Sequence, residues 1–477
     1  MADSVKGQLV RGVAWNFIEK VLMKSVQFVI GIILARLLSP SDFGLIGMLA
    51  IFIAISNVFI EGGLAKALIQ KQNCQDIDYS TAFVSNVGMS IMIYSILFVS
   101  APWIADFYDE PILKDLTRVF ALNFILGAFN IVQRAKLMAK VDFKSLAQIN
   151  VISVVISGCI GVGMAYYGCG VWSLVGQSIC STIVLIVLFP LYSKWKPSIR
   201  FSKDSFKRLF GFGSKLMVTG TVSVIVNNIS TICIGKMYRS SQLGYFTRAS
   251  QFSELISSTL FDVLGNVTFP VLSELQDEKE RFLAVYRRSL LFTAMVVMPV
   301  MILGVLLARP LVLVLLTEKW LPCVVLMQWL FLSRIVIPLS AINLNVMNAL
   351  GRPDLFMKTD LSKLPMNLLM LAITIPIGVE AICIGMLCTS WIAFFINAYY
   401  SGKLLGYGGL QQLKDWRYII ASVLLMALAV ALITYFIHNV WLQLIVGGIV
   451  GMSTYIVCCF QFKVIDVDML RMLINKK

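Results

Sequence analysis

Histidine and charged residues are scarce in this sequence. His438 is the single histidine among 477 residues, and Asp, Glu, Lys and Arg together make up 14% of the chain, against about a quarter in ordinary soluble proteins. One histidine cannot build a His-rich metal site or a His-based acid–base pair. The composition therefore argues against metallohydrolase chemistry and against His-based catalysis.

Motifs for thiol, metal or nucleotide chemistry are also missing. The ten cysteines form no C-x-x-C pair, and no GxxxxGK[ST] loop is present. Several cysteines lie in apolar runs, where cysteine behaves as a small apolar residue: Cys159, Cys180, Cys233, Cys383 and Cys388. Without a P-loop the chain does not hydrolyse nucleotide by that route, so an ion gradient, the membrane potential or the solute's own gradient must drive any transport.

Long apolar segments dominate the chain, in which 58% of residues are hydrophobic. A membrane helix needs roughly 20 mainly apolar residues, and that length predicts fourteen spans. The first follows Lys6 and Arg11 and is too long for a signal peptide, so we interpret it as an uncleaved helix. The predicted spans are 10–35, 44–65, 80–104, 114–136, 147–167, 170–192, 209–235, 244–271, 286–308, 322–349, 357–377, 379–401, 418–437 and 440–461.

The basic residues predict the orientation of these spans. Most of the 40 Lys and Arg residues fall on the side of the N-terminus when spans alternate, and Lys and Arg concentrate in cytoplasmic loops. Both termini are therefore predicted to be cytoplasmic. These loops also account for the net charge of +15, so a nucleic-acid partner is not expected. The richest loop, 193–208, is predicted to lie at the surface of anionic lipid.

An internal repeat appears at an offset of two hundred residues. Leu34–Ala50 (LARLLSPSDFGLIGMLA) corresponds to Ile234–Ser250 (IGKMYRSSQLGYFTRAS), and Gly44 aligns with Gly244. In both copies one helix ends, a short turn follows and a glycine lies near the start of the next helix. The pattern predicts two copies of a six-helix unit.

An even number of spans in each copy gives both copies the same orientation, related by an axis along the membrane normal. The predicted divisions are an N-lobe at 1–192, a basic cytoplasmic linker at 193–208, a C-lobe at 209–401, and two further spans with a tail at 402–477. The fold class is thus an all-α polytopic membrane protein. Two similar lobes around a central cavity suggest alternating access by rocking.

Polar residues form a stripe on the first helix of each predicted lobe. The spacing of Asn16, Lys20, Lys24, Gln27 and Gly31 places them within a sector of about 80°. A matching stripe on 209–235 contains Lys215, Thr219, Ser223, Asn227 and Ser230. We expect Lys20, Lys24, Gln27 and Asn227 to face a cavity, with snorkelling of the two lysines to the interface as the alternative.

Further polar groups occur inside later spans, where ionisable residues are costly and normally face protein or water. Asn57 and Glu61 lie four apart in the second span. Span 244–271 carries Arg248, Glu254, Ser258 and Asp262, and Arg334 lies within span 322–349, followed by Asn343, Asn345 and Asn348. Arg248 and Arg334 are predicted to attract an anionic head group. The acids are interpreted either as ion- or proton-coupling groups or as an interhelical network.

A water-accessible chamber lined by Lys20, Lys24, Arg248 and Arg334 would strengthen charge interactions, because its walls have a low dielectric constant. Guanidinium groups bind phosphate through a bidentate fork, and ammonium groups act as point charges. The predicted chamber therefore suits a phosphate-bearing or acidic-sugar solute.

Two stretches resemble a known family. Ala35–Lys71 (ARLLSPSDFGLIGMLAIFIAISNVFIEGGLAKALIQK) and Phe206–Phe252 (FKRLFGFGSKLMVTGTVSVIVNNISTICIGKMYRSSQLGYFTRASQF), followed by Phe269–Glu278 (FPVLSELQDE), resemble the polysaccharide exporters of the multidrug/oligosaccharidyl-lipid/polysaccharide flippase superfamily. The branch of colanic acid, teichuronic acid and O-antigen exporters is the most similar. The resemblance implies a fourteen-helix flippase in the bacterial plasma membrane that moves an undecaprenyl-pyrophosphate-linked oligosaccharide.

The resemblance also carries expectations about the site and its partners. Relatives that flip the peptidoglycan precursor use cationic cavity residues to hold pyrophosphate, and Lys20, Lys24 and Arg248 occupy comparable helices, whereas the second span offers Glu61. It implies no cofactor and leaves Na⁺ or H⁺ coupling open. The implied partners are the lipid-linked oligosaccharide, membrane lipids and the machinery that polymerises the glycan and sets its length.

Two other functions remain as alternatives. A multidrug/cation antiporter of the same superfamily would favour acidic binding residues and usually has twelve spans. A membrane-embedded glycosyltransferase or polymerase would normally carry long outer loops or an acidic catalytic motif, and neither is evident in the sequence. We therefore expect a transporter rather than an enzyme.

Overall fold

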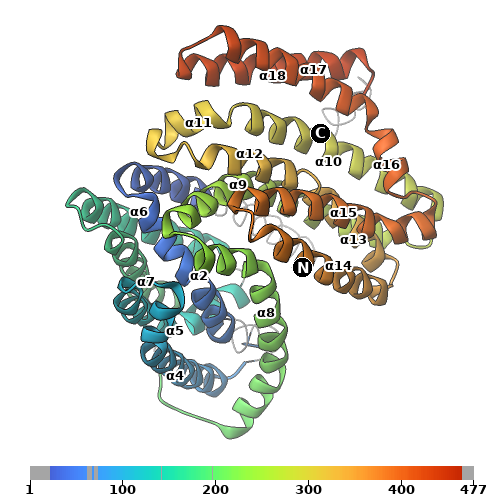
Figure 1. Cartoon of the computed structure of the whole chain (residues 1–477). Helices are drawn as coiled ribbons and strands as arrows, with labels where there is room; N and C mark the ends of the chain where they lie inside the picture. Colours follow the sequence, from blue (N-terminus) through green and yellow to red (C-terminus); the bar gives the residue numbers. More distant parts are fainter. Residues whose placement is uncertain (1–21, 62–66, 69–73, 141, 196, 465–477) are drawn as a thin grey trace. The chain divides into compact units, whose positions relative to one another are not determined.

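The computed structural model describes residues 22–61, 67–68, 74–140, 142–195 and 197–464, apart from the side chains of residues 61, 212, 259–267 and 270. The described chain is built from helices and the turns that connect them, and it contains no strand (Figure 1). The predicted all-α class is confirmed. Contacts divide the chain into two compact units, Met1–Gly244 and Tyr245–Lys477.

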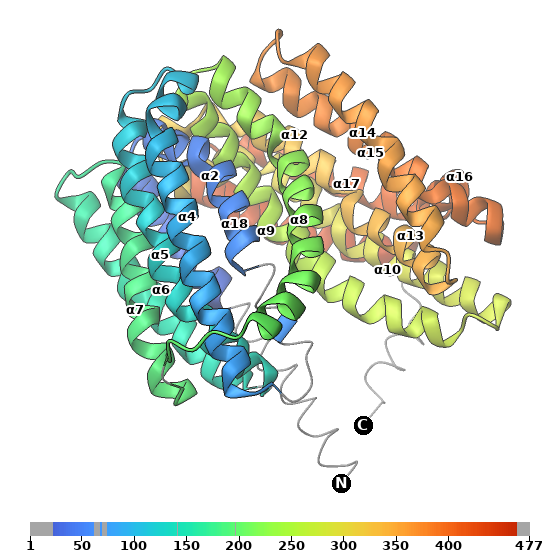
Figure 2. The same cartoon turned by 90° about the horizontal axis from the view of Figure 1, so that it is seen from below.

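Unit 1 is a bundle of long helices. Residues 22–37 are helical. The helices that follow are α2 (Pro40–Glu61), α4 (Asp76–Tyr108), α5 (Ile112–Ala139), α6 (Phe143–Tyr166), α7 (Trp172–Ser193) and α8 (Lys203–Met237). Figure 2 shows α4, α5, α6 and α7 running side by side, and α8 packs on α2 and α4. Helix α9 (Ser240–Glu274) begins at the end of unit 1 and continues into unit 2.

Unit 2 contains shorter and more interrupted helices. They are α10 (Lys279–Leu306), α11 (Ala308–Leu315), the 3₁₀ turn Glu318–Trp320, α12 (Cys323–Arg334), α13 (Ile337–Ala349), α14 (Pro353–Thr374), α15 (Val379–Leu405), α16 (Gly409–Asp415), α17 (Arg417–Phe436) and α18 (Val440–Gln461). Helix α15 packs on α12, α13 and α14. The last two helices form a hairpin that contacts α10 (Figure 1).

Helices occupy the described parts of all fourteen predicted spans, with the beginning of the first span (10–21) and the end of the second (62–65) outside the described residues. Eleven helical segments of the described chain are long and apolar enough to cross a membrane. The three predicted spans outside this group are the first one, α9 and α14. Helix α14 carries Lys358, Asp360 and Lys363 in its first half. The chain is thus a multi-pass membrane protein, and the count of fourteen stays a prediction.

The predicted span 322–349 is two helices that meet near Val336. Helix α12 ends at Arg334, and α13 starts at Ile337 with Pro338 in its first turn. Proline has no amide proton and clashes with the preceding turn, so it is favoured at the start of a helix, although α4, α7, α10 and α14 accommodate Pro102, Pro190, Pro299 and Pro365 in their interiors. The sequence prediction missed this break because it followed hydropathy alone.

The two copies of the sequence repeat meet each other at their glycines. A Cβ atom added to Gly44 would clash with the carbonyl of Ser240, and one added to Gly244 would clash with the carbonyl of Pro40. Residues 40 and 44 correspond to residues 240 and 244 in the repeat. The contact of 44 with 240 therefore becomes the contact of 244 with 40 when the two copies are exchanged, as contacts related by a local two-fold axis do. Glycine permits this close approach of two backbones. The two repeat segments therefore contact each other within unit 1.

The basic linker 193–208 is attached to the start of α4. The carboxylate of Asp78, which is buried, accepts hydrogen bonds from the hydroxyl of Ser205 and the backbone amide of Gln75. The hydroxyls of Ser80 and Ser198 lie 2.5 Å apart, and the amide of Ser202 donates to Thr81 Oγ1 at 3.0 Å. These bonds fix the start of α8 on unit 1.

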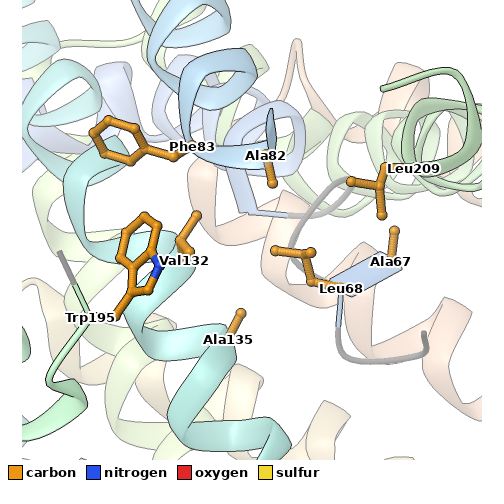
Figure 3. Close-up of a cluster of buried hydrophobic side chains, with 8 residues drawn as sticks. All are labelled: Ala67, Leu68, Ala82, Phe83, Val132, Ala135, Trp195 and Leu209. Carbon is orange, nitrogen blue, oxygen red and sulfur yellow. The ribbon is translucent and has the colours of Figure 1, made fainter. Parts of the chain in front are cut away.

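Apolar packing reinforces this attachment (Figure 3). Trp195 of the linker packs edge-on against Phe83 of α4, with ring centroids 6.0 Å apart, and Leu209 of α8 joins the same buried cluster. The contact units accordingly divide at Gly244 and leave α8 in unit 1. The predicted lobes, which were defined by the sequence repeat rather than by contacts, stay a prediction.

Candidate functional site

A cavity of about 590 Å³ lies within unit 1 among α2, α5, α6 and α7. Its lining combines amide, hydroxyl, guanidinium and apolar side chains. The described lining residues with polar side chains are Asn57, Asn123, Asn130, Arg134, Asn150, Ser178 and Thr182. We call this cavity the α5 groove, because α5 supplies the largest part of its wall.

One face of α5 forms this wall. Asn123, Gly127, Asn130, Arg134 and Met138 are spaced by four, three, four and four residues, so they lie on the same side of the helix. The lining residues of α5 extend over 120–138, which corresponds to about 27 Å at 1.5 Å per residue. The groove therefore follows α5 through most of the apolar layer.

Hydrogen bonds hold the polar side chains of the groove in place. Thr182 Oγ1 donates to Asn123 Oδ1 at 2.9 Å, and Asn130 Nδ2 donates to the carbonyl of Thr182 at 3.4 Å. Asn130 is 7% exposed, and its Oδ1 atom has no hydrogen-bond partner among the described residues. A buried acceptor without a partner is costly, so this atom is suited to a ligand hydroxyl or a water molecule.

The charge and polarity of the groove restrict what it can bind. Arg134 is the charged residue of the described lining, which includes no carboxylate. Phe120 and Phe124 add aromatic surface beside the amides. Oxygen-rich cation sites normally contain carboxylates, so the described lining favours a neutral hydroxyl-rich or an anionic solute over a cation.

Asn57 is the predicted site residue that lies in this groove. The sequence analysis missed Asn123, Asn130 and Arg134, although their spacing of seven and four within one span was visible. It also missed Asn150, Ser178 and Thr182, which come from two further helices. Asparagine, serine and threonine were overlooked because that reasoning followed charge.

The described residues of the two predicted polar stripes are exposed or half-buried, and Asn16 lies outside the described residues. Lys24 is half-buried, whereas Gln27 on the same helix and Asn227 on α8 are exposed. Lys215, also on α8, is exposed. Lys20 lies outside the described residues, and the side chain of Glu61 at the end of α2 is likewise not described. The assignment of these residues to a cavity stays a prediction.

Arg248 on α9 has surroundings that differ from the predicted wet wall. It is 6% exposed, its Nη1 donates to Gln251 Oε1 at 2.5 Å, and its guanidinium carbon lies 6.0 Å from the centre of the Trp320 ring. Arginine stacks on aromatic rings in this way. Arg248 is therefore packed in protein in this conformation.

Arg334 and Glu254, which were predicted separately, are brought together. Arg334 Nη2 lies 3.5 Å from Glu254 Oε2, with 16% and 61% of the two side chains exposed. This ion pair links α12 to α9 within unit 2, and the role of the acids in coupling or in a network between the lobes stays a prediction. Ser258, one turn further along α9, is half-buried, and the side chain of Asp262 is not described.

The three asparagines that follow Arg334 do not line one cavity. Asn343 is completely buried, its Oδ1 accepts from the Tyr286 hydroxyl at 2.5 Å, and its amide donates to Gln412 Oε1 at 3.2 Å. The prediction that Asn343 lines a cavity was therefore wrong. Asn345 lines a separate pocket of about 360 Å³ among α13, α14 and α15.

Comparisons with known proteins agree with this architecture. A family model described as "Polysaccharide biosynthesis protein" matches residues 33–325. The teichuronic acid biosynthesis protein TuaB of Bacillus subtilis (strain 168) is 24% identical over 354 residues, covering 74% of this chain and 73% of the relative. The succinoglycan biosynthesis transport protein ExoT of Rhizobium meliloti (strain 1021) is 26% identical over 321 residues, covering 67% of this chain and 65% of the relative.

A solved structure extends the comparison to nearly the whole chain. The lipid II flippase MurJ, in an inward closed conformation, superimposes with a TM-score of 0.74 at 14% sequence identity, covering 95% of this chain and 98% of that one. This likeness concerns the fold alone. It confirms the predicted all-α fold over nearly the whole chain.

Proposed function

Because this chain belongs to the polysaccharide biosynthesis protein family, we propose that it is a flippase that moves a lipid-linked oligosaccharide across the membrane. The relatives act in the biosynthesis of teichuronic acid and the biosynthesis and transport of succinoglycan, as their names state. The fold is that of a lipid II flippase. The proposal assigns to this chain the same class of cargo, a polar head on a lipid carrier.

The α5 groove is the observation that carries the proposal. On the membrane-spanning helix α5, two amides and one guanidinium lie on one face between Asn123 and Arg134, and further amides and hydroxyls from α2, α6 and α7 line the same groove. Unsatisfied polar groups are strongly disfavoured in hydrocarbon, so such a wall needs a polar occupant. A sugar–phosphate head can use it while its isoprenoid tail stays in lipid.

The finer parts of the proposal follow the family resemblance. The carrier is undecaprenyl pyrophosphate, the membrane is the bacterial plasma membrane, and both termini lie in the cytoplasm. The chain works as a transporter without catalytic chemistry, by alternating access, and an H⁺ or Na⁺ gradient is an energy source to test. Its product feeds a polymerase at the outer leaflet.

A leaflet-resolved assay tests the proposal. In a strain lacking this protein, the lipid-linked intermediate should accumulate in the cytoplasmic leaflet. In liposomes that contain this intermediate, the purified protein should expose it at the outer face. An equal distribution between leaflets in the deletion strain, with no effect of the reconstituted protein, would reject the flippase. Proton- or Na⁺-driven efflux of organic cations by the same liposomes would support an antiporter instead.

A further inference from the structure

We propose that the α5 groove is the subsite that holds the sugar rings of the oligosaccharide, and that it recognises neutral, hydroxyl-rich rings rather than the pyrophosphate. The inference rests on the proposed function and adds a place and a chemical class to it. The size, the polar atoms and the walls of the groove, which helices of unit 1 form, favour this occupant.

The dimensions suit a small glycan. A cavity of about 590 Å³ lies within the range of roughly 300–1,000 Å³ that is usual for small-molecule sites. The lining on α5 is elongated along the helix rather than collected at one end. An elongated groove fits consecutive sugar rings better than a compact phosphate group.

The polar atoms match sugar hydroxyls. An asparagine amide offers two donors and one acceptor oxygen, and a hydroxyl both donates and accepts. Three of the four asparagines of the groove, Asn57, Asn123 and Asn130, come from two helices, and Ser178 and Thr182 come from a third. The oxygen of Asn130, buried and without a described partner, accepts a hydroxyl proton. Neutral donors and acceptors in alternation are the complement of a polyol.

The walls support the same occupant. Phe120 and Phe124 line the groove beside the amides, and the negative face of an aromatic ring attracts the partly positive C–H groups of a sugar ring. A pyrophosphate would call for several cationic groups, whereas Arg134 is the single charged residue of the described lining. The groove therefore recognises the glycan part of the substrate.

Gly127 provides a way to fill the groove without disturbing the protein. It lines the groove on α5, and a Cβ atom added to it meets no heavy atom within 4 Å. Gly127→Leu should therefore project an isobutyl group into the space of the sugar. Gly88 on α4 is also helical, is exposed, and has no atom within 4 Å of an added Cβ, and it is not among the lining residues. Gly88→Leu is the matched control.

Binding of two lipids separates the glycan from the rest of the ligand. The probes are the glycan-bearing lipid extracted from the deletion strain and sugar-free undecaprenyl pyrophosphate, each titrated against full-length protein in detergent. Gly127→Leu should weaken binding of the glycan-bearing lipid at least about tenfold, the loss expected when one or two hydrogen bonds are removed. Its affinity for the sugar-free lipid, and both affinities of Gly88→Leu, should equal those of the wild type.

The outcomes distinguish this inference from the proposed function. Unchanged affinity of Gly127→Leu for the glycan-bearing lipid would overturn the sugar subsite. An equal loss for both lipids would place the carrier head in the groove and would also overturn it. If wild-type protein binds and flips neither lipid, the proposed function itself fails. Asn130→Leu serves as a second variant, with the same expected selectivity for the glycan.

Discussion

Two asparagines inside spanning helices have opposite surroundings. Asn343 in unit 2 has no exposed surface; its amide donates to Gln412, and its oxygen accepts from the Tyr286 hydroxyl. Asn130 in unit 1 lines the α5 groove, donates to one carbonyl, and has a buried side-chain oxygen without a partner among the described residues. The first residue joins helices together, and the second leaves binding capacity available to a solute.

The difference shows how polar residues in a membrane protein should be sorted. Polar groups in spans are costly and mark function or structure, and their number or position in the sequence does not separate the two. The separation comes from whether protein already satisfies their hydrogen bonds. Where it does, removing the side chain costs stability, and where it does not, removal should cost ligand binding.

The largest effect is expected when a glycine packed against another backbone is replaced, compared with a glycine that faces open space. Gly44→Ala places a methyl group against the carbonyl of Ser240, a backbone atom that cannot rotate away. We expect a loss of about 3 kcal/mol or more in unfolding free energy, at the upper end of overpacking effects. Gly127→Ala points into the open groove and should be neutral or stabilising by up to about 1 kcal/mol, because alanine favours helix.

Thermal and denaturant unfolding in detergent would measure both glycine variants. Similar melting temperatures for Gly44→Ala and Gly127→Ala would contradict the close contact of the two repeats. Gly244→Ala, the partner under the offset of two hundred, should be destabilised as strongly as Gly44→Ala because it meets the carbonyl of Pro40.

A second prediction compares the asparagines themselves. Asn343→Ala removes hydrogen bonds to Tyr286 and Gln412 and leaves both buried, so it should cost about 2 kcal/mol of stability. Asn130→Ala should cost less than about 1 kcal/mol, because one long hydrogen bond of 3.4 Å is lost. Transport of the lipid-linked oligosaccharide should change in the reverse order, with Asn130→Ala the more impaired per folded molecule. The same order for stability and transport would mean that the groove is only structural.

The fold was largely predictable from the sequence because hydropathy and length define membrane helices. The last span was predicted at 440–461 and is observed as α18, Val440–Gln461, and the span 379–401 corresponds to α15, Val379–Leu405. The break between α12 and α13 was missed because a proline such as Pro338 does not by itself mark a break: four other prolines lie inside continuous helices. The short helix α16 was missed because seven residues with four amide or charged side chains do not form an apolar run.

The candidate site was less predictable, for a physical reason. Charges are conspicuous in an apolar sequence, so the prediction selected Arg248 and Arg334, which the structure places against Trp320 and Glu254. The polar side chains of the groove are mainly neutral amides and hydroxyls from helices distant in sequence. Whether such groups are satisfied depends on tertiary packing, which one sequence does not reveal.

A third prediction concerns the ion pair between α9 and α12. Because Glu254 is 61% exposed, water screens the pair, and a double-mutant cycle of Arg334→Gln and Glu254→Gln should give a coupling of only about 0.5–1 kcal/mol. Adding salt should reduce it further. A coupling well above this range would mean that protein shields the pair from water in the folded state. Arg334 would then be a structural residue, like Asn343.

The smallest effect is expected for a solvent-exposed ion pair. Arg352 holds Asp354 by two hydrogen bonds of 2.9 Å just before the predicted span 357–377, and this lowers the pKa of Asp354 to about 2. A depressed folded-state pKa stabilises the protein above the unfolded-state value, near 3.9, and the contribution is lost as pH falls toward 2. The melting temperature of Asp354→Asn should therefore lie slightly below that of the wild type, by a constant amount from pH 5 to 8, and the difference should shrink below pH 4. In an Arg352→Gln background the Asp354→Asn substitution should lose this acid dependence. A difference that persists unchanged at pH 3 in both backgrounds would assign the effect to helix initiation by Asp354 rather than to the pair.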